Sequence, residues 1–438
     1  MSGFDRRAGG PATLSEGGAG RPAEDASTGR GYARGARVLS IGIAATGVFT
    51  FAYFAVASHV LGRDEYGAIS TLWAILFVTI SVIYRPVEQL LSRTIADARA
   101  RGVHQHELRG PATIQLAFAA AFFVVALALH GTLRDKAFNG SDALYWVLVG
   151  ATLAYAGSYF ARGYLAGHQW FGLYGGLVLF ESLSRFCFPL AVAVGIASGQ
   201  KAVAFGILAA PVASLLVVPW AISRHAGGAT GGGASRESAG FAVAVAAIQL
   251  AEQTLVTIAV LLIPDAALRG IVFNALLIAR APLQLFQAIQ TSLLPHLAGV
   301  EATEGAEGHG AIRITALAIA AFAGLCALGL LAIGPFVMDL AFGKGFAYGR
   351  LGLVAVAVGM GFHLVAGTLN QAALASGRAP AAARAWLIAA AAFVVWMLLP
   401  IVDDRLARAE FGYLGAAALL CAQLWALYAA GRSRTAVR

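Results

Sequence analysis

The sequence predicts an all-α, polytopic membrane protein with about twelve transmembrane helices in two six-helix lobes around a central cleft. The first observation is composition: the 438 residues are 59% hydrophobic and 12% charged, with a mean hydropathy of +0.74. Soluble domains carry roughly 25% charged residues. The second is that apolar runs of about 20 residues, the length that crosses a bilayer core, recur along the chain. The third is a single Gly-rich linker between the sixth and seventh runs.

The elements follow in order along the chain. Residues 1–35 lack large apolar side chains, so we expect a disordered cytoplasmic tail. The predicted membrane segments are 37–60, 67–91, 111–131, 143–165, 172–197, 201–222, 240–263, 270–294, 311–333, 350–375, 381–401 and 411–430. The stretch 334–342, GPFVMDLAF, either extends the ninth segment or forms a re-entrant piece.

These segments define the expected domains. An N-terminal lobe spans 36–222, the Gly-rich cytoplasmic linker 223–239, a C-terminal lobe 240–432, and a short tail 433–438. An even number of helices in each half gives both halves the same orientation, as in transporters built from parallel repeats.

Basic residues predict the sidedness. Loops on the side of the N-terminus carry more Lys and Arg than those opposite, which predicts cytoplasmic termini and a multi-pass protein of the cytoplasmic membrane. This topology accounts for the net charge of +9, so nucleic acid is not expected as a partner.

Motifs of soluble chemistry are missing from the sequence. It contains no Walker loop, no H-E-x-x-H and no paired-cysteine zinc spacing. Cys187, Cys326 and Cys421 lie far apart in apolar runs, which is not a disulfide or metal pattern. We therefore expect no enzyme activity, no catalytic residue, no metal and no cofactor.

Polar residues form stripes inside two of the apolar segments, each the second of its half. Ionisable residues at membrane depth are costly and usually face a cavity or a partner. The stripe in the second segment, spaced by three, four and seven residues, comprises Ser81, Arg85, Glu88, Gln89 and Ser92. The stripe in the eighth segment comprises Arg280, Gln284, Gln287 and Thr291.

Both stripes have an arginine close to a proline, as Arg85-Pro86 and as Arg280-Ala-Pro282. Proline-interrupted helices at matching places in two halves are a pointer to a transporter site. Further polar residues lie in segments 4, 5, 7 and 10: Tyr155, Ser158, Tyr159, Arg162, Glu181, Arg185, Gln249, Glu252, Gln253, His363, Asn370 and Gln371. The remaining segments are nearly bare, as expected for a water-filled cleft between two lobes.

Each of these residues also has a purely structural interpretation. Arg85 can extend to the cytoplasmic headgroups, and Glu181 with Arg185 can form a buried pair that only fixes packing. Glu252 and His363 can be packing residues, and the glutamines of the eighth segment can hold helices together. If Arg85, Arg185 and the arginine of segment 8 share one cleft, its positive potential favours an anionic, phosphorylated substrate, because guanidinium groups match phosphate oxygens.

Three stretches resemble a known family. They are residues 60–75, VLGRDEYGAISTLWAI; residues 339–352, DLAFGKGFAYGRLG; and residues 369–378, LNQAALASGR. The first resembles the outer loop and second helix of bacterial Wzx-type polysaccharide flippases. These belong to the multidrug/oligosaccharidyl-lipid/polysaccharide (MOP) exporter superfamily. The other two resemble the surroundings of that family's tenth helix.

The resemblance implies a flippase that moves undecaprenyl-pyrophosphate-linked oligosaccharide repeat units across the cytoplasmic membrane by alternating access, for surface polysaccharide biosynthesis. Family members that flip the peptidoglycan precursor use cavity arginines on helices matching segments 1, 2 and 8. Arg85 and Arg280 match the last two, whereas Arg37 matches poorly. Those members add two more helices, so twelve segments favour an exopolysaccharide or O-antigen-like cargo. The expected substrate-binding residues are Arg85, Arg280, Arg185, Gln284 and Gln287.

The carboxylates expected to couple transport to protons or sodium ions are Glu252, Glu181 and Glu88, because burial favours the protonated form of a carboxylic acid. Membrane lipids and the glycan polymerisation machinery are the expected partners. The alternative function is a multidrug or cation antiporter of the same superfamily. Two further hypotheses are a glycan-polymerising or ligating enzyme, against which the short outer loops argue, and a non-transporting scaffold.

Overall fold

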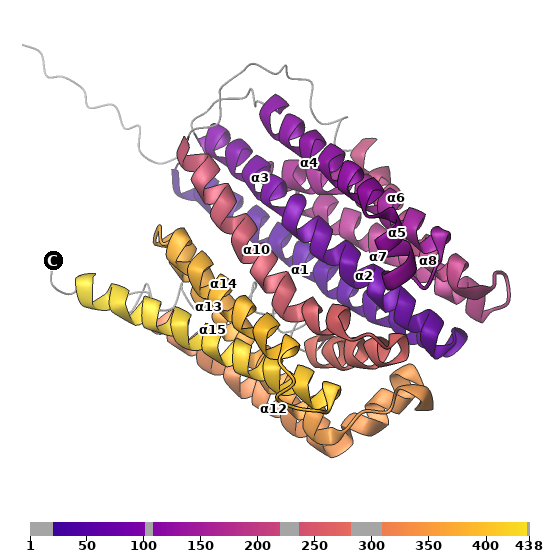
Figure 1. Ribbon diagram of the computed structural model, residues 1–438. Helices are drawn as coiled ribbons and strands as arrows, with labels where there is room; N and C mark the ends of the chain where they lie inside the picture. Colours follow the sequence, from indigo (N-terminus) through magenta and orange to yellow (C-terminus); the bar gives the residue numbers. More distant parts are fainter. Residues whose placement is uncertain (1–20, 101–107, 220–235, 282–308, 436–438) are drawn as a thin grey trace, which may run out of the picture.

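The computed structural model describes residues 21–100, 108–219, 236–281 and 309–435, which fold into helices joined by turns and loops (Figure 1). Within these ranges, 11 helices are long and apolar enough to cross a membrane. The predicted segment 270–294 is described only as far as residue 281, and the helix there covers 266–281. The predicted all-helical polytopic fold class is therefore confirmed.

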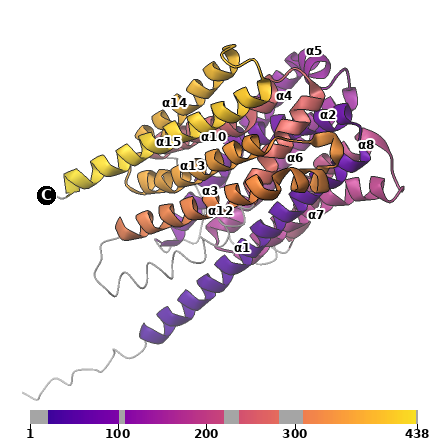
Figure 2. The ribbon, with the colours of Figure 1, turned by 90° about the horizontal axis from the view of Figure 1, so that it is seen from below.

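The N-terminal half contains α1 (Arg21–Val60), α2 (Arg63–Ile83), α3 (Arg85–Ala100), α4 (Arg109–Ala128), α6 (Asp142–Gly167), α7 (Phe171–Ala193) and α8 (Gly199–Ser214). A short α5 (His130–Thr132) and a π-helical turn (Leu133–Ala137) follow α4. The structure differs from the expected disordered tail in that residues 21–35 are helical, and α1 extends beyond the bundle (Figure 2). Once a membrane segment has nucleated a helix, adding further residues to it costs little.

The C-terminal half contains α10 (Arg236–Leu262), the helix 266–281, α12 (His309–Phe342), α13 (Arg350–Ala375), α14 (Ala379–Leu398) and α15 (Arg405–Thr435). Residues 334–342 continue α12, so they extend the ninth segment and are not re-entrant. The beginning of α1 and the end of α15 lie at the same end of the bundle in both views (Figures 1 and 2).

Corresponding helices pack together in both halves. In the first half α1 packs on α7, α7 and α6 pack on α8, and α4 packs on α6. In the second half α10 packs on α14, α14 and α13 pack on α15, and α12 packs on α13. The order of the partners along the chain is the same in the two sets. Between the halves, α10 packs across onto α2 and α3, as Figure 1 shows.

The two halves contact each other at the end opposite the chain termini. A Cβ atom added to Gly67 of α2 would overlap the backbone carbonyl of Ala266, so glycine permits this approach. Beside it, the hydroxyl of Tyr66 donates to the side-chain oxygen of Asn274. Arg269 Nη1 also donates to Thr71 Oγ1 over 2.9 Å. This end of the interface is therefore held by backbone contact and by hydrogen bonds between the halves.

The helix of the second apolar segment is interrupted next to Pro86, as predicted. Helix α2 ends at Ile83 and α3 begins at Arg85, because Pro86 lacks a backbone N–H and its ring crowds the preceding turn. The N–H of Tyr84 still donates to the Ile80 carbonyl over 3.0 Å, so the break is small. Residues 63–96 consequently remain one apolar span that carries Arg85 at the junction.

Candidate functional site

A polar cluster crosses the interface between the two halves. Arg85 Nη1 on α3 donates to Gln249 Oε1 on α10 over 3.0 Å. Gln249 Nε2 in turn donates to Glu252 Oε2 over 3.1 Å. The other carboxylate oxygen of Glu252 lies 3.9 Å from His363 Nε2 on α13. Arg280, on the helix 266–281, is also within electrostatic reach of Glu252. Two arginines from opposite halves thus face one carboxylate.

The side chain of Arg85 crosses the interface, since its guanidinium is partly buried and bonded to α10. This geometry differs from extension toward the headgroups.

A second cluster lies within the N-terminal half, centred on Glu181 of α7. Its carboxylate accepts hydrogen bonds from Tyr155 OH at 2.9 Å, Arg185 Nη2 at 3.0 Å and Ser158 Oγ at 3.4 Å, and it also pairs with Arg162. Arg185 is only 2% exposed and donates as well to Tyr155 OH. Glu181 and Arg185 therefore form the buried pair that the sequence left open as an alternative.

Arg185 does not lie with Arg85 and Arg280. Its guanidinium packs over the ring of Trp73 at 4.4 Å, and Nη1 lies 3.4 Å from Thr50 Oγ1 of α1. Arg185 therefore belongs to the cluster around Glu181, whereas Arg85 and Arg280 belong to the cluster around Glu252. A helical stripe shows which residues share a face, but not which neighbouring helix covers that face.

Glu88 links the two clusters. It accepts a hydrogen bond from Tyr174 OH over 2.9 Å and interacts electrostatically with both Arg85 and Arg162. Charges of opposite sign therefore alternate from the C-terminal half into the N-terminal half. In order, the members of this charge chain are Arg280, Glu252, Arg85, Glu88, Arg162, Glu181 and Arg185.

Arg162 is the charged residue that the sequence-based choice of site residues omitted. It lies on α6 between Glu88 and Glu181, with its guanidinium 4.6 Å from the ring centre of Tyr159. The four-residue stripe of segment 4 pointed to it, since that stripe puts Arg162 on the same face as Tyr155. Two other predicted substrate-binding residues, Gln284 and Gln287, lie outside the described residues.

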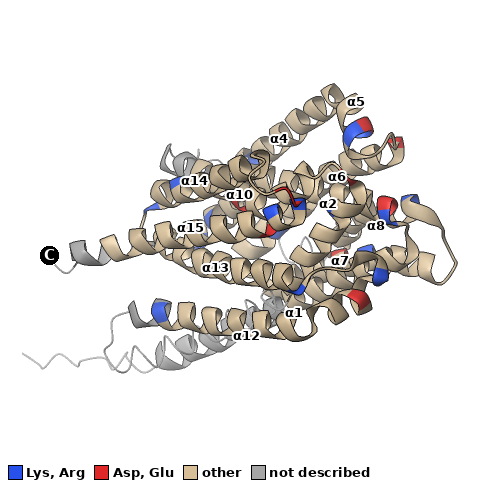
Figure 3. Cartoon of the chain, turned by 60° about the horizontal axis from the view of Figure 1, so that its bottom comes forward, with Lys and Arg blue, Asp and Glu red and all other residues tan. Residues whose placement is uncertain are grey.

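The charge chain lies in a protein that has few other charged residues along its helices. Figure 3 shows helices that are almost free of charged residues along much of their length. A cavity of about 60 Å³ lies at the Arg280 end of the charge chain, between α2, α10 and the helix 266–281. Trp73, Phe77, Thr257 and Arg280 are among its lining residues.

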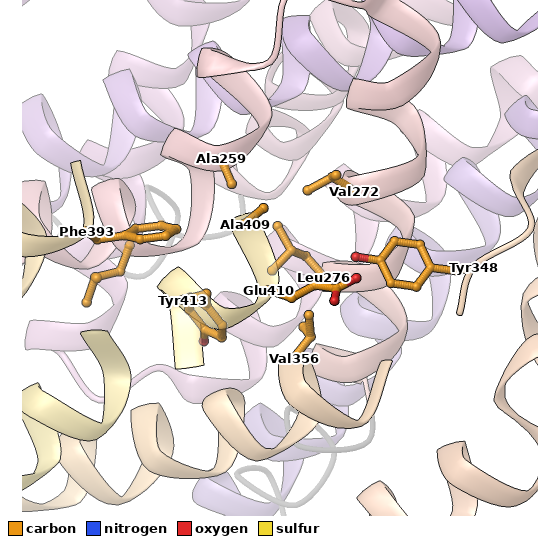
Figure 4. A pocket seen from close by; sticks show the side chains of 10 residues that line it. Ala259, Val272, Leu276, Tyr348, Val356, Phe393, Ala409, Glu410 and Tyr413 are labelled. Carbon is orange, nitrogen blue, oxygen red and sulfur yellow. The ribbon is translucent and has the colours of Figure 1, made fainter. Parts of the chain in front are cut away.

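A smaller cavity of about 10 Å³ lies inside the C-terminal half (Figure 4). Glu410 of α15 points toward Tyr348, and a Cβ atom added to Gly352 would overlap its carboxylate. Burial and the charge of Glu410 raise the pKa of Tyr348 well above its usual value, so the phenol stays protonated and bonds to Glu410. A space of this size holds about one water molecule, which is too little for any cargo.

Solved structures share this fold. A multidrug resistance MATE family transporter of the MOP superfamily, in its inward-facing conformation, matches with TM-score 0.62 and 14% identity over 92% of this chain and 98% of its own. An outward-facing conformation of a multidrug resistance MATE family transporter of the MOP superfamily matches with TM-score 0.64 and 15% identity, over 93% of this chain and 96% of its own. The Vibrio cholerae MATE transporter VcmN matches with TM-score 0.64 and 16% identity, over 93% and 98%. No protein-family model and no curated protein matches the sequence.

The chain thus has the two-lobe, twelve-helix fold of MATE transporters of the MOP superfamily. At these identities the likeness extends to the fold alone, and one fold serves many cargoes.

Proposed function

We propose that this protein is a flippase that moves polyprenyl-pyrophosphate-linked oligosaccharides across the cytoplasmic membrane by alternating access. The observation that carries the proposal is the meeting of Arg85 and Arg280, from opposite halves, at the single carboxylate of Glu252. Over the whole charge chain four arginines face three carboxylates, so one positive charge is in excess. The helices around it are poor in charge along much of their length.

The chemistry favours a phosphate-bearing headgroup. A guanidinium presents several N–H donors in a plane and matches two phosphate oxygens at once. At about 4 Å and an effective dielectric near 20, one such charge pair is worth roughly 4 kcal/mol. A pyrophosphate can exchange with Glu252 as the partner of both arginines, while the polyprenyl tail remains in the lipid.

The lobe contacts support an alternating-access cycle. With the termini in the cytoplasm, as the basic loops predict, the contact of Gly67 with Ala266 lies on the outer side. The described conformation is then closed to the outside at this end. Opening toward the outside requires breaking the Tyr66–Asn274 and Arg269–Thr71 hydrogen bonds.

Glu252 is better placed than Glu181 to couple transport to an ion. Glu181 is paired with two arginines and two hydroxyl groups, so protonating it would break several bonds at once. Glu252 instead faces His363, whose buried Nδ1 has no hydrogen-bond partner among the described residues. We propose that Glu252 takes up a coupling proton or ion when a phosphate occupies Arg85 and Arg280.

The competing candidate is export of cationic drugs, favoured by the similarity to multidrug MATE transporters. The excess arginine in the charge chain argues against it, because a cationic cargo would meet a like charge at close range. A carboxylate-rich interface would suit such a cargo better.

The test replaces Arg280 with alanine in the full chain and follows lipid-linked saccharide on the cytoplasmic face of membrane vesicles. Arg384→Ala, which removes an exposed arginine of α14, is the matched control. Flipping is expected to fall at least about tenfold in Arg280→Ala, since the lost pair is worth more than 1.4 kcal/mol. Arg384→Ala should behave like the wild type.

A deletion strain distinguishes saccharide flipping from drug export. Loss of drug resistance with normal saccharide flipping in a deletion strain would exclude the flippase function. Unchanged flipping in Arg280→Ala at equal expression would remove this arginine from the site. Glu252→Gln is expected to keep substrate binding while transport loses its response to an imposed ion gradient.

A further inference from the structure

Two aromatic side chains of α2 lie beside the arginine site. Trp73 and Phe77 are one helical turn apart, and their rings stack with centroids 5.7 Å apart and planes 21° from parallel. Both line the 60 Å³ cavity between the halves, together with Thr257 and Arg280. Both are also only partly buried, whereas their α2 neighbours Leu72 and Leu76 are fully buried. The pair therefore faces the transport interface rather than the core of one lobe.

A guanidinium packs against each ring. Arg185 lies 4.4 Å from the centre of the Trp73 ring, and Arg280 lies 5.8 Å from that of Phe77. The face of an aromatic ring is negative and its edge positive, which is why cations settle on the face. Because fixed arginines already use this attraction, the pair is a poor site for a cationic ligand.

A saccharide suits the same surface. One face of a pyranose ring exposes C–H groups that pack on an aromatic face, while its hydroxyl groups lie around the rim and need polar neighbours or water. Trp73 and Phe77 supply the aromatic surface, and the Thr257 hydroxyl lines the same cavity. Binding sites for small ligands commonly combine such apolar walls with a few polar groups that fix orientation.

The position of the aromatic pair next to Arg280 indicates which part of the cargo it would contact. In a lipid-linked saccharide the first sugar is joined directly to the pyrophosphate. A headgroup held by Arg280 therefore brings that sugar next to Phe77, the ring that this arginine contacts. The present cavity has room for only a few water molecules, so the sugar enters when the halves separate.

We propose that Trp73 and Phe77 form a carbohydrate subsite for the first sugar behind the pyrophosphate, which rests on the proposed flippase function. The cargo is then recognised at two adjacent places, through charge at Arg85 and Arg280 and through stacking on α2. The subsite discriminates saccharide-bearing carrier from bare carrier, which the arginines alone do not.

The experiment measures binding of two probes to the purified full chain in detergent. One probe is polyprenyl pyrophosphate carrying a single N-acetylhexosamine, and the other is bare polyprenyl pyrophosphate. Trp73→Leu and Phe77→Leu keep apolar volume and remove the ring, and Trp146→Leu, at an exposed tryptophan of α6, is the matched control. Size-exclusion profiles verify that each variant is folded.

Trp73→Leu and Phe77→Leu are expected to weaken binding of the sugar-bearing probe about three- to tenfold, the range of one aromatic contact, and to leave bare carrier unchanged. Phe77→Tyr should restore sugar binding, and Trp146→Leu should match the wild type. Equal weakening of both probes, or no weakening, overturns the subsite. Arg280→Ala is expected to weaken both probes. If the wild type binds neither probe, the flippase function itself fails, and the subsite falls with it.

Discussion

Replacing Glu181 with glutamine tests whether this carboxylate stabilises the N-terminal half or serves transport. The carboxylate is shared by Arg162 and Arg185, and it accepts hydrogen bonds from two hydroxyl groups. Glutamine keeps the size but removes the charge. Arg185, at 2% exposure, would then be a buried cation without its counterion.

The expected cost can be ranked from these contacts. Removing one partner of a buried ion pair lowers the free energy of unfolding by about 3–5 kcal/mol. We expect a loss of this size in Glu181→Gln. Arg185→Met should lose less, because Glu181 keeps Arg162, Tyr155 and Ser158 as partners. The double variant should lose less than the sum of the two single changes, since neither charge of the pair is then left alone.

The assay is reversible denaturant unfolding in mixed micelles, followed by tryptophan fluorescence, with saccharide flipping measured in parallel. Ser182→Ala is a control on the same helix, because its hydroxyl bonds only to carbonyls of the preceding turn. A Glu181→Gln variant as stable as the wild type but unable to transport would refute the structural role and return Glu181 to the coupling candidates.

Three further predictions concern the lobe contacts and the site. Gly67→Ala should hold the lobes apart at the end opposite the chain termini, because the new Cβ overlaps the facing backbone of Ala266; longer spin-label distances between α2 and the helix 266–281 would verify it, and unchanged distances would contradict it. Gly352→Ala should destabilise by about 1–3 kcal/mol, seen as earlier unfolding in denaturant, because the methyl group overlaps the Glu410 carboxylate; unaltered unfolding would show that Glu410 can move. Arg85→Lys should slow flipping about tenfold, since an ammonium lacks the planar fork, and full activity in proteoliposomes would mean that charge alone suffices.

Much of the fold follows from properties that are local in the chain. Apolar runs of membrane length predict their own helices, because in lipid every backbone N–H and C=O must bond within its own segment. The break between α2 and α3 follows from Pro86 in the same way. The continuation of α12 through residues 334–342 was not decided by the sequence. Nothing in that stretch distinguishes a longer helix from a re-entrant turn until it packs on α13.

For the candidate site, the sequence pattern identified polar residues but not the partners that they contact. Periodicity by itself identified Arg85, Glu88, Glu181, Arg185 and Glu252 as polar residues on apolar helices. Only the tertiary structure decided that Arg162 of α6 joins the Glu181–Arg185 pair of α7 and that Arg85 of α3 reaches α10 in the other half. The physical reason is that a buried charge is stabilised by whichever opposite charge the packing brings within a few ångströms. That partner lies on another helix, at a distance along the chain that no periodicity encodes.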